Sequence, residues 1–343
     1  MKKFIYEDSN KSGIGDRLFD LILVYTYSKY LKCDKLFLNW HVDKEDVCGN
    51  KSFHSKIRRN KTPFREFDYL LENLQKYIIL PDDIIFVSKE KIHKLSDEKD
   101  NIIFKEYMGI KYTLYSFMNK YIKEDKRKSF EENYFDNFNK IKFKNIPKEM
   151  FDYFKDNEVV TVHLRRGDKV ANDGGTSNGI TESDLNNLDR LTIDKINKLY
   201  NLNYRYFNFV SDEKKVRDYY LSLFKNKINC KIFNGDQVSQ TYYDIYSLVH
   251  SKKIILSQVF SVFSIFSSMI NKIDLHYLLD HPKMNKFKIY KNITSINEIS
   301  KNKINISNKY LLVNNFDIKK YNFKELLINS YSKKFNKNIV LDE

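Results

Sequence analysis

Two consecutive arginines, Arg165 and Arg166, are the residues of this sequence whose types and spacing most clearly indicate chemistry. They lie in the segment His163–Lys169 (HLRRGDK), directly after the apolar, β-branched run 159–164. Such a run predicts a buried parallel strand, and ligands of open α/β sheets bind at the carboxyl ends of strands. Because guanidinium groups bind phosphate oxygens in pairs, the segment predicts a diphosphate site, with Asp168 holding one arginine. An ordinary ion pair in a surface loop is the alternative.

The net charge of +15, from 60 Lys and Arg against 45 Asp and Glu, could instead indicate a nucleic-acid-binding protein. Only 10 of the 60 cations are arginines, and the lysines are spread along the whole chain without an RNA-recognition, zinc-finger or helix-turn-helix signature. The single Ala, the few Gly and Pro, and the abundant Lys, Asn, Ile, Tyr and Phe are typical of an AT-rich genome. We therefore interpret the lysine excess as surface composition and expect no nucleic-acid polymer as partner.

Hydrophobic residues make up 42% and aromatic residues 15% of the chain, enough for a large core, which excludes global disorder. The most apolar stretch, 254–270, carries no charge, but it contains several serines and is too short and polar for a membrane span. The N-terminus becomes acidic before an apolar stretch of signal-peptide length develops. The three cysteines are scattered and form neither a disulfide framework nor a metal motif. These features predict a soluble, cytoplasmic protein.

Strand and helix patterns alternate in two regions, which predicts the start of an α/β unit in the first and a doubly wound α/β domain in the second. The first region opens with a strand at 3–6, a glycine-bearing turn, a helix over 16–31 and a strand at 35–39. In the second region five runs predict strands, namely 159–164, 204–210, 230–233, 254–256 and 274–277. Helical patterns follow the second, third and fourth of these runs.

The dipeptide Ile146-Pro147 marks the expected junction, because the residue before a proline resists helix. We expect an N-terminal domain over 1–148, a C-terminal domain over 149–290, and a tail over 291–343 with one helix.

The segment HLRRGDK resembles the His-x-Arg-Arg-x-Asp signature of the fucosyltransferase superfamily, which comprises the α1,2-, α1,6- and protein O-fucosyltransferases. The resemblance implies a GT-B fold, in which two Rossmann-like domains face a cleft, and GDP-fucose as the donor substrate. It makes 1–148 the acceptor-side domain and 149–290 the domain that binds the nucleotide sugar. It places Arg165 on the β-phosphate. It also places the rest of the segment around the nucleotide, namely His163, Arg166, Asp168 and Lys169.

Two later segments resemble further donor-domain motifs of this family. The strand 206–210 and the residues after it place Asp212 near the nucleotide, although Asp212 could equally cap the following helix. The stretch from Asp244 to 261 resembles an Asp-bearing helix followed by a strand and a serine-rich turn. One alignment with the family motif selects Ser257 and another selects Ser261. Either serine could belong to a phosphate site at a helix N-terminus. The alternative is that these serines only cap and pack a buried helix.

The N-terminal segment GIGDRLF resembles the Gly-x-Gly-Asn-Arg/Gln-Leu-Phe turn of the α1,2 enzymes, which implies that Gly13 and Gly15 face the cleft. Asp16 stands where the family has Asn. Glycines in a strand-to-helix turn need no ligand, so the turn alone is the weaker indication. The arginine motif favours an α1,6-type enzyme, whereas this turn and Phe260-Ser261 favour an α1,2-type enzyme.

The resemblance implies an inverting transfer of fucose to a glycan hydroxyl, with Arg165 stabilising the departing diphosphate. Asp173 is the candidate general base, because 168–173 resembles an α1,6-type Asp-Lys-Val-x-x-Glu run; a role only in the glycine-bearing loop 173–179 is the alternative. The sequence has no Asp-x-Asp triplet and no cluster with metal-ligand spacing, so we expect no metal and no cofactor. The rival hypotheses are a GT-B transferase for another sugar nucleotide and a non-catalytic nucleotide- or polyanion-binding protein.

Overall fold

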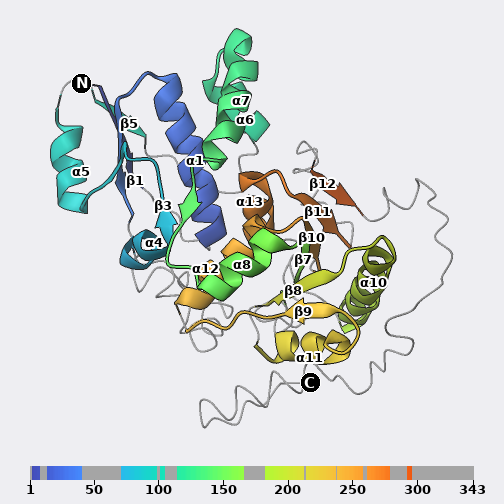
Figure 1. The fold of residues 1–343 in the computed structure, drawn as a ribbon. Coiled ribbons are helices and arrows are strands. Elements are labelled where there is room, and N and C mark those ends of the chain that lie inside the picture. The colour runs from blue at the N-terminus through green and yellow to red at the C-terminus, as the bar shows by residue number, and fades with distance from the viewer. Residues whose placement is uncertain are drawn as a thin grey trace, which may run out of the picture.

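The computed structural model describes ten stretches of the chain, which are 2–7, 14–40, 71–98, 101–104, 114–165, 182–211, 214–236, 238–257, 261–278 and 292–295. Two parallel sheets organise these residues, one of four strands and one of six (Figure 1). Helices cover both sheets, so the predicted α/β class with two Rossmann-like halves is confirmed. The predicted tail helix lies outside the described residues. No helix in the described stretches is both long and apolar enough to span a membrane.

The first sheet has the strand order β4-β2-β1-β5. Its strands are β1 (Lys3–Glu7), β2 (Lys35–Asn39), β4 (Ile84–Phe86) and β5 (Ile102–Phe104). Its helices are α1 (Ile14–Tyr30), α4 (Leu71–Tyr77), α5 (Lys89–Ser96), α6 (Leu114–Tyr121) and α7 (Arg127–Phe138), with a 3₁₀ turn at Glu124–Lys126. A small antiparallel pair, β3 (Ile78–Ile79) with β6 (Lys142–Phe143), connects this half to the next.

The second sheet has the strand order β12-β11-β10-β7-β8-β9. Its strands are β7 (Val159–His163), β8 (Tyr206–Val210), β9 (Asn229–Lys231), β10 (Lys253–Leu256), β11 (Asp274–Tyr277) and β12 (Ile293–Ser295). Its helices are α8 (Lys148–Asp156), α10 (Glu182–Asn201), α11 (Lys214–Phe224), α12 (Ser239–Val249) and α13 (Val262–Ile270).

The strand order of the second sheet reverses at β7. The chain runs outward from β7 to β8 and β9, then returns to place β10 on the other side of β7 and continues to β11 and β12. All five residues of β7 are buried, as the β-branched run predicts for a central parallel strand. In such sheets a ligand binds at the carboxyl ends of the strands where the order reverses, here between β7 and β10.

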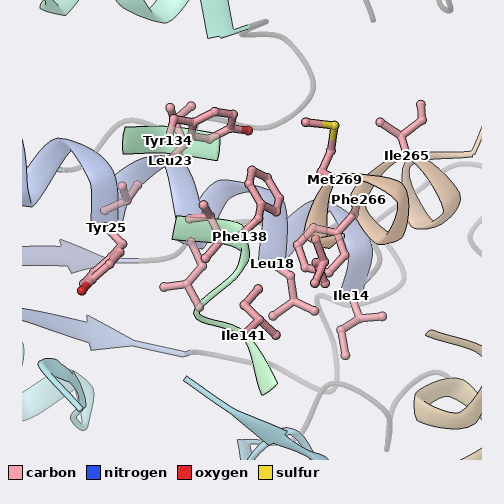
Figure 2. Packing of buried hydrophobic residues seen from close by; sticks show 14 of the residues in the cluster. Ile14, Leu18, Leu23, Tyr25, Tyr134, Phe138, Ile141, Ile265, Phe266 and Met269 are labelled. Carbon is pink, nitrogen blue, oxygen red and sulfur yellow. The ribbon is translucent and has the colours of Figure 1, made fainter. Parts of the chain in front are cut away.

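One hydrophobic core joins the two sheets. Phe266 of α13 packs against Phe138 of α7 and Phe19 of α1, with ring centroids 5.8 and 6.4 Å apart (Figure 2). Leu18 and Met269 are buried in the same cluster. Helices α10 and α11 cover the opposite face of the second sheet, with a core of their own. The shared core therefore fixes the start of α1 against the start of α13.

Candidate functional site

The carboxyl end of β7 lies between its two neighbours, where the strand order reverses. The Leu164 N–H donates to the Val210 carbonyl at 2.7 Å, and the Ser257 N–H donates to the His163 carbonyl at 3.0 Å. The Ser211 hydroxyl donates to the Leu164 carbonyl at 2.5 Å. These bonds hold the backbone in place up to Arg165, which follows directly and is half-buried. Arg165 therefore stands at the point of the sheet where a ligand is expected.

His163 ties the end of β7 to the first turn of α13. Its side chain is 4% exposed, and its Nδ1 hydrogen-bonds the Ser264 hydroxyl. Its ring centroid lies 5.7 Å from that of Phe263. The sequence places His163 near the nucleotide; in the structure its contacts set the distance between the arginine segment and α13.

The two serines left open by the sequence have different surroundings, although both are fully buried. The Ser257 hydroxyl accepts a hydrogen bond from the Thr192 hydroxyl of α10 at 2.6 Å, which ties it to helix packing. Ser261 is the N-cap of α13, and its side chain accepts from the Ser264 N–H at 3.5 Å. The remaining N–H groups of this first turn form the positive end of the helix dipole, close to His163, which contacts Ser264 and Phe263.

Gly15 lies where α1 and α13 approach most closely. A Cβ at this position would lie 2.8 Å from the Cα and 3.1 Å from the backbone N of Phe263. Both are backbone atoms, so neither can turn aside. Gly15 is therefore needed for the close approach of α1 to α13. That Gly15 also faces a ligand stays a prediction.

Replacing Gly15 with alanine is expected to destabilise the protein by about 1–3 kcal/mol, because the added methyl group forces the two helix starts apart. Chemical denaturation measures this change, and Glu132→Ala on the exposed face of α7 is the control, with a change below about 0.5 kcal/mol. A Gly15→Ala protein as stable as the wild type would contradict the contact.

A buried cation flanks the same turn on the side of the first sheet. Arg17, in the first turn of α1, is 3% exposed, and its guanidinium lies 4.3 Å above the ring of Trp40, which follows β2. Stacking on an aromatic face stabilises a buried arginine. The start of α1 thus carries a buried positive charge beside the end of β2.

Asp244 lies on α12, near the carboxyl ends of β8 and β9, because α12 contacts both Arg217 of α11, the helix after β8, and the loop after β9. It is 9% exposed and accepts a hydrogen bond from Gln240 Nε2 at 2.7 Å. Asp236 anchors the start of this helix by accepting hydrogen bonds from the Ser239 hydroxyl and from the Ser239 and Val238 N–H groups. These three bonds, that of the Ser239 hydroxyl first, lower the pKa of Asp236.

Arg217 of α11 is a charged partner of Asp244 that the sequence analysis does not single out. Its Nη1 lies 3.9 Å from Asp244 Oδ1. The only sequence signal is the rarity of arginine, together with its position in the first turn of the helix after the Asp212 segment.

The described part of the chain brings together Gly15, His163, Arg165, Ser257 and Ser261, while Asp244 and Arg217 lie toward β9. Six predicted residues lie outside the described stretches and stay predictions, namely Gly13, Arg166, Asp168, Lys169, Asp173 and Asp212. Within the described stretches, no three His, Cys, Asp or Glu side chains come close enough to hold a metal ion.

Solved structures of fucosyltransferases are similar to this chain in fold. NodZ α1,6-fucosyltransferase co-crystallised with GDP has 12% sequence identity and a TM-score of 0.47, over 80% of this chain and 94% of that chain. Fucosyltransferase NodZ from Bradyrhizobium has 13% identity and a TM-score of 0.45 over the same shares. POFUT1 in complex with GDP has 11% identity and a TM-score of 0.42, over 80% of this chain and 98% of that chain. Each is a likeness of fold. No family model and no curated protein matches the sequence.

Proposed function

We propose that the protein is an inverting fucosyltransferase that moves fucose from GDP-fucose to a hydroxyl of a glycan acceptor. The observation that carries this proposal is the position of Arg165. It follows the central strand β7 where the strand order reverses, and His163 ties that strand end to the Ser261-capped start of α13. A guanidinium beside a helix N-terminus is a site for a diphosphate. The choice of fucose as the sugar and guanine as the base rests on the resemblance of HLRRGDK to the fucosyltransferase signature.

In the proposed reaction the acceptor oxygen attacks the anomeric carbon of fucose while the bond from that carbon to the β-phosphate oxygen breaks. GDP leaves with both electrons of that bond, and the acceptor proton passes to a general base. Arg165 and the N–H groups at the start of α13 stabilise the charge that grows on the departing phosphate. Asp173 remains the proposed base, and it lies outside the described residues.

A thermal-shift screen with GDP, UDP and CMP tests the nucleotide. We expect GDP at about 100 times its Kd to stabilise the protein by about 2.7 kcal/mol, with little effect of UDP or CMP at the same concentration. A larger shift with UDP would overturn the donor and favour another GT-B transferase.

Incubation of the protein with GDP-fucose and a panel of glycans, followed by mass spectrometry, then tests the transfer. Addition of one deoxyhexose to an acceptor supports the proposal. GDP binding without either transfer or hydrolysis would instead favour a non-catalytic nucleotide-binding protein. Linkage analysis of the product separates the α1,6 from the α1,2 alternative.

A further inference from the structure

Arg217 is buried without the hydrogen bonds that a buried guanidinium ordinarily makes. Its side chain is only 6% exposed, and its charged partner Asp244 is 3.9 Å away, beyond hydrogen-bond distance. Within the described residues, neither Nε nor Nη1 has a hydrogen-bond partner. Buried arginines are almost always fully paired, so these two N–H donors indicate an acceptor that the protein itself does not supply.

Gln240 holds Asp244, the charged partner of Arg217, against the loop that follows β9. Gln240 Nε2 donates to Asp244 and also to the Phe233 carbonyl at 3.1 Å, while Gln240 Oε1 accepts from the Gly235 N–H at 2.9 Å. Phe233 and Gly235 belong to the loop that follows β9. The Arg217–Asp244 pair therefore stands at the carboxyl end of β8 and β9, on the same edge of the sheet as Arg165.

The chemistry of this pair does not suit a phosphate. Asp244 would repel an anion next to Arg217, whereas a neutral group that carries an acceptor beside N–H donors matches both side chains. The edge of a nucleobase is such a group. Strands are spaced by about 4.8 Å, so the end of β9 is about 10 Å from that of β7, a distance that a ribose and a base can span.

We propose that Arg217 is a specificity-determining residue that donates to the carbonyl oxygen of the donor's nucleobase, with Asp244 accepting from the N–H groups beside it. The inference rests on the proposed function, because Arg165 must hold the diphosphate of the same nucleotide. Turning the Arg217 side chain toward the ligand breaks no hydrogen bond of Nε or Nη1, because these atoms make none. The base thus completes a polar cluster that is incomplete in the protein alone.

Two ligands, one with and one without a base, test this role. Calorimetry measures GDP and inorganic pyrophosphate binding to the wild type, to Arg217→Lys and to Arg205→Lys. Lysine keeps the charge but loses the planar fork of donors. We expect Arg217→Lys to weaken GDP binding by about 10-fold or more and to leave pyrophosphate binding unchanged. Arg205→Lys, an exposed arginine on the opposite edge of the sheet, is expected to change neither.

Three results would overturn the inference. In the first, Arg217→Lys binds GDP as the wild type does, which removes Arg217 from the site and leaves the proposed function intact. In the second, it loses GDP and pyrophosphate equally, which indicates a role in folding or phosphate binding. In the third, the wild type itself binds no GDP, which overturns the proposed function together with this inference. Thermal denaturation of each variant establishes that it is folded.

Discussion

Replacing Arg165 with alanine is expected to lower kcat for the proposed transfer by about 10²- to 10³-fold, which is about 3–4 kcal/mol of barrier. The departing diphosphate gains negative charge in the transition state, and Arg165 stands where β7 ends beside the start of α13. Because this charge is greater in the transition state than in bound GDP-fucose, KM for the donor should rise less than kcat falls. Initial rates of GDP release at limiting and saturating donor separate the two constants.

Two further variants test whether the effect requires a guanidinium group at residue 165. Arg165→Lys keeps a point charge without the bidentate fork and is expected to fall between the wild type and the alanine variant. Arg205→Ala removes an exposed arginine that stacks on Tyr200 at 4.2 Å, at the other end of the sheet, and should leave the rate unchanged. A folded Arg165→Ala protein with wild-type kcat would remove Arg165 from the catalytic residues.

Five of the six strands of the second sheet could be predicted from the sequence, because short apolar runs bounded by polar turns indicate them, whereas β12 falls in the expected tail. The expected strand at 274–277 coincides with β11, and the expected runs at 159–164 and 254–256 differ from β7 and β10 by one residue at an end. These strands are buried on both faces, so each is recognised as a continuous apolar run, without an alternation of apolar and polar residues. Because Arg165 directly follows the predicted strand 159–164, its place at the carboxyl end of the sheet could be predicted from the end of that strand alone.

Helix α10 was missed, for a physical reason that its burial shows. Its buried face carries polar side chains among the apolar ones, because Asp189, Thr192 and Lys195 are buried together with Leu188 and Leu199. Such a mixed face is a weaker signal than the four-residue apolar spacing that indicates an amphipathic helix. The strands β4 and β5 are three residues long, too short to distinguish from other apolar triplets.

The contacts between distant segments could not be predicted from either segment alone. The need for glycine at Gly15 depends on the backbone of Phe263, nearly 250 positions later. The partner of Asp244 comes from another helix, and a lone arginine in a helix carries no motif. The sequence thus located the strand end that holds the candidate site, while the packing of α1, α11, α12 and α13 decides which side chains reach it.

Lys195 of α10 is a buried cation outside the candidate site, and its charge opposes folding. It is 5% exposed, and burial, with the nearby cations Lys198 and Lys253, lowers its pKa from 10.5 to about 8. The unfolded chain therefore binds this proton more tightly than the folded chain. The resulting penalty is complete below pH 8, where it is about 3 kcal/mol, and fades as the pH rises from 8 toward 10.5.

His276 of β11 adds a second penalty in acid. Burial, with the charges of Lys195 and Lys253, lowers the pKa of His276 from 6.5 to about 3. The unfolded chain takes up this proton below pH 6.5 while the folded chain does not, so stability decreases further as the pH falls from 6.5 toward 3.

Lys195→Met keeps the apolar stem and removes the buried charge, so it is expected to stabilise the protein by about 2–3 kcal/mol at pH 7. The difference from the wild type should shrink to about 1 kcal/mol at pH 10, because the folded-state lysine is then neutral and only the remaining protonation of the unfolded chain opposes folding. Urea denaturation at the two pH values measures both differences, and Lys215→Met, on the exposed face of α11, is the control with no such pH dependence. Unchanged or lower stability of Lys195→Met at pH 7 would show that the ammonium group is solvated or paired in the folded protein, which the 5% exposure of Lys195 argues against.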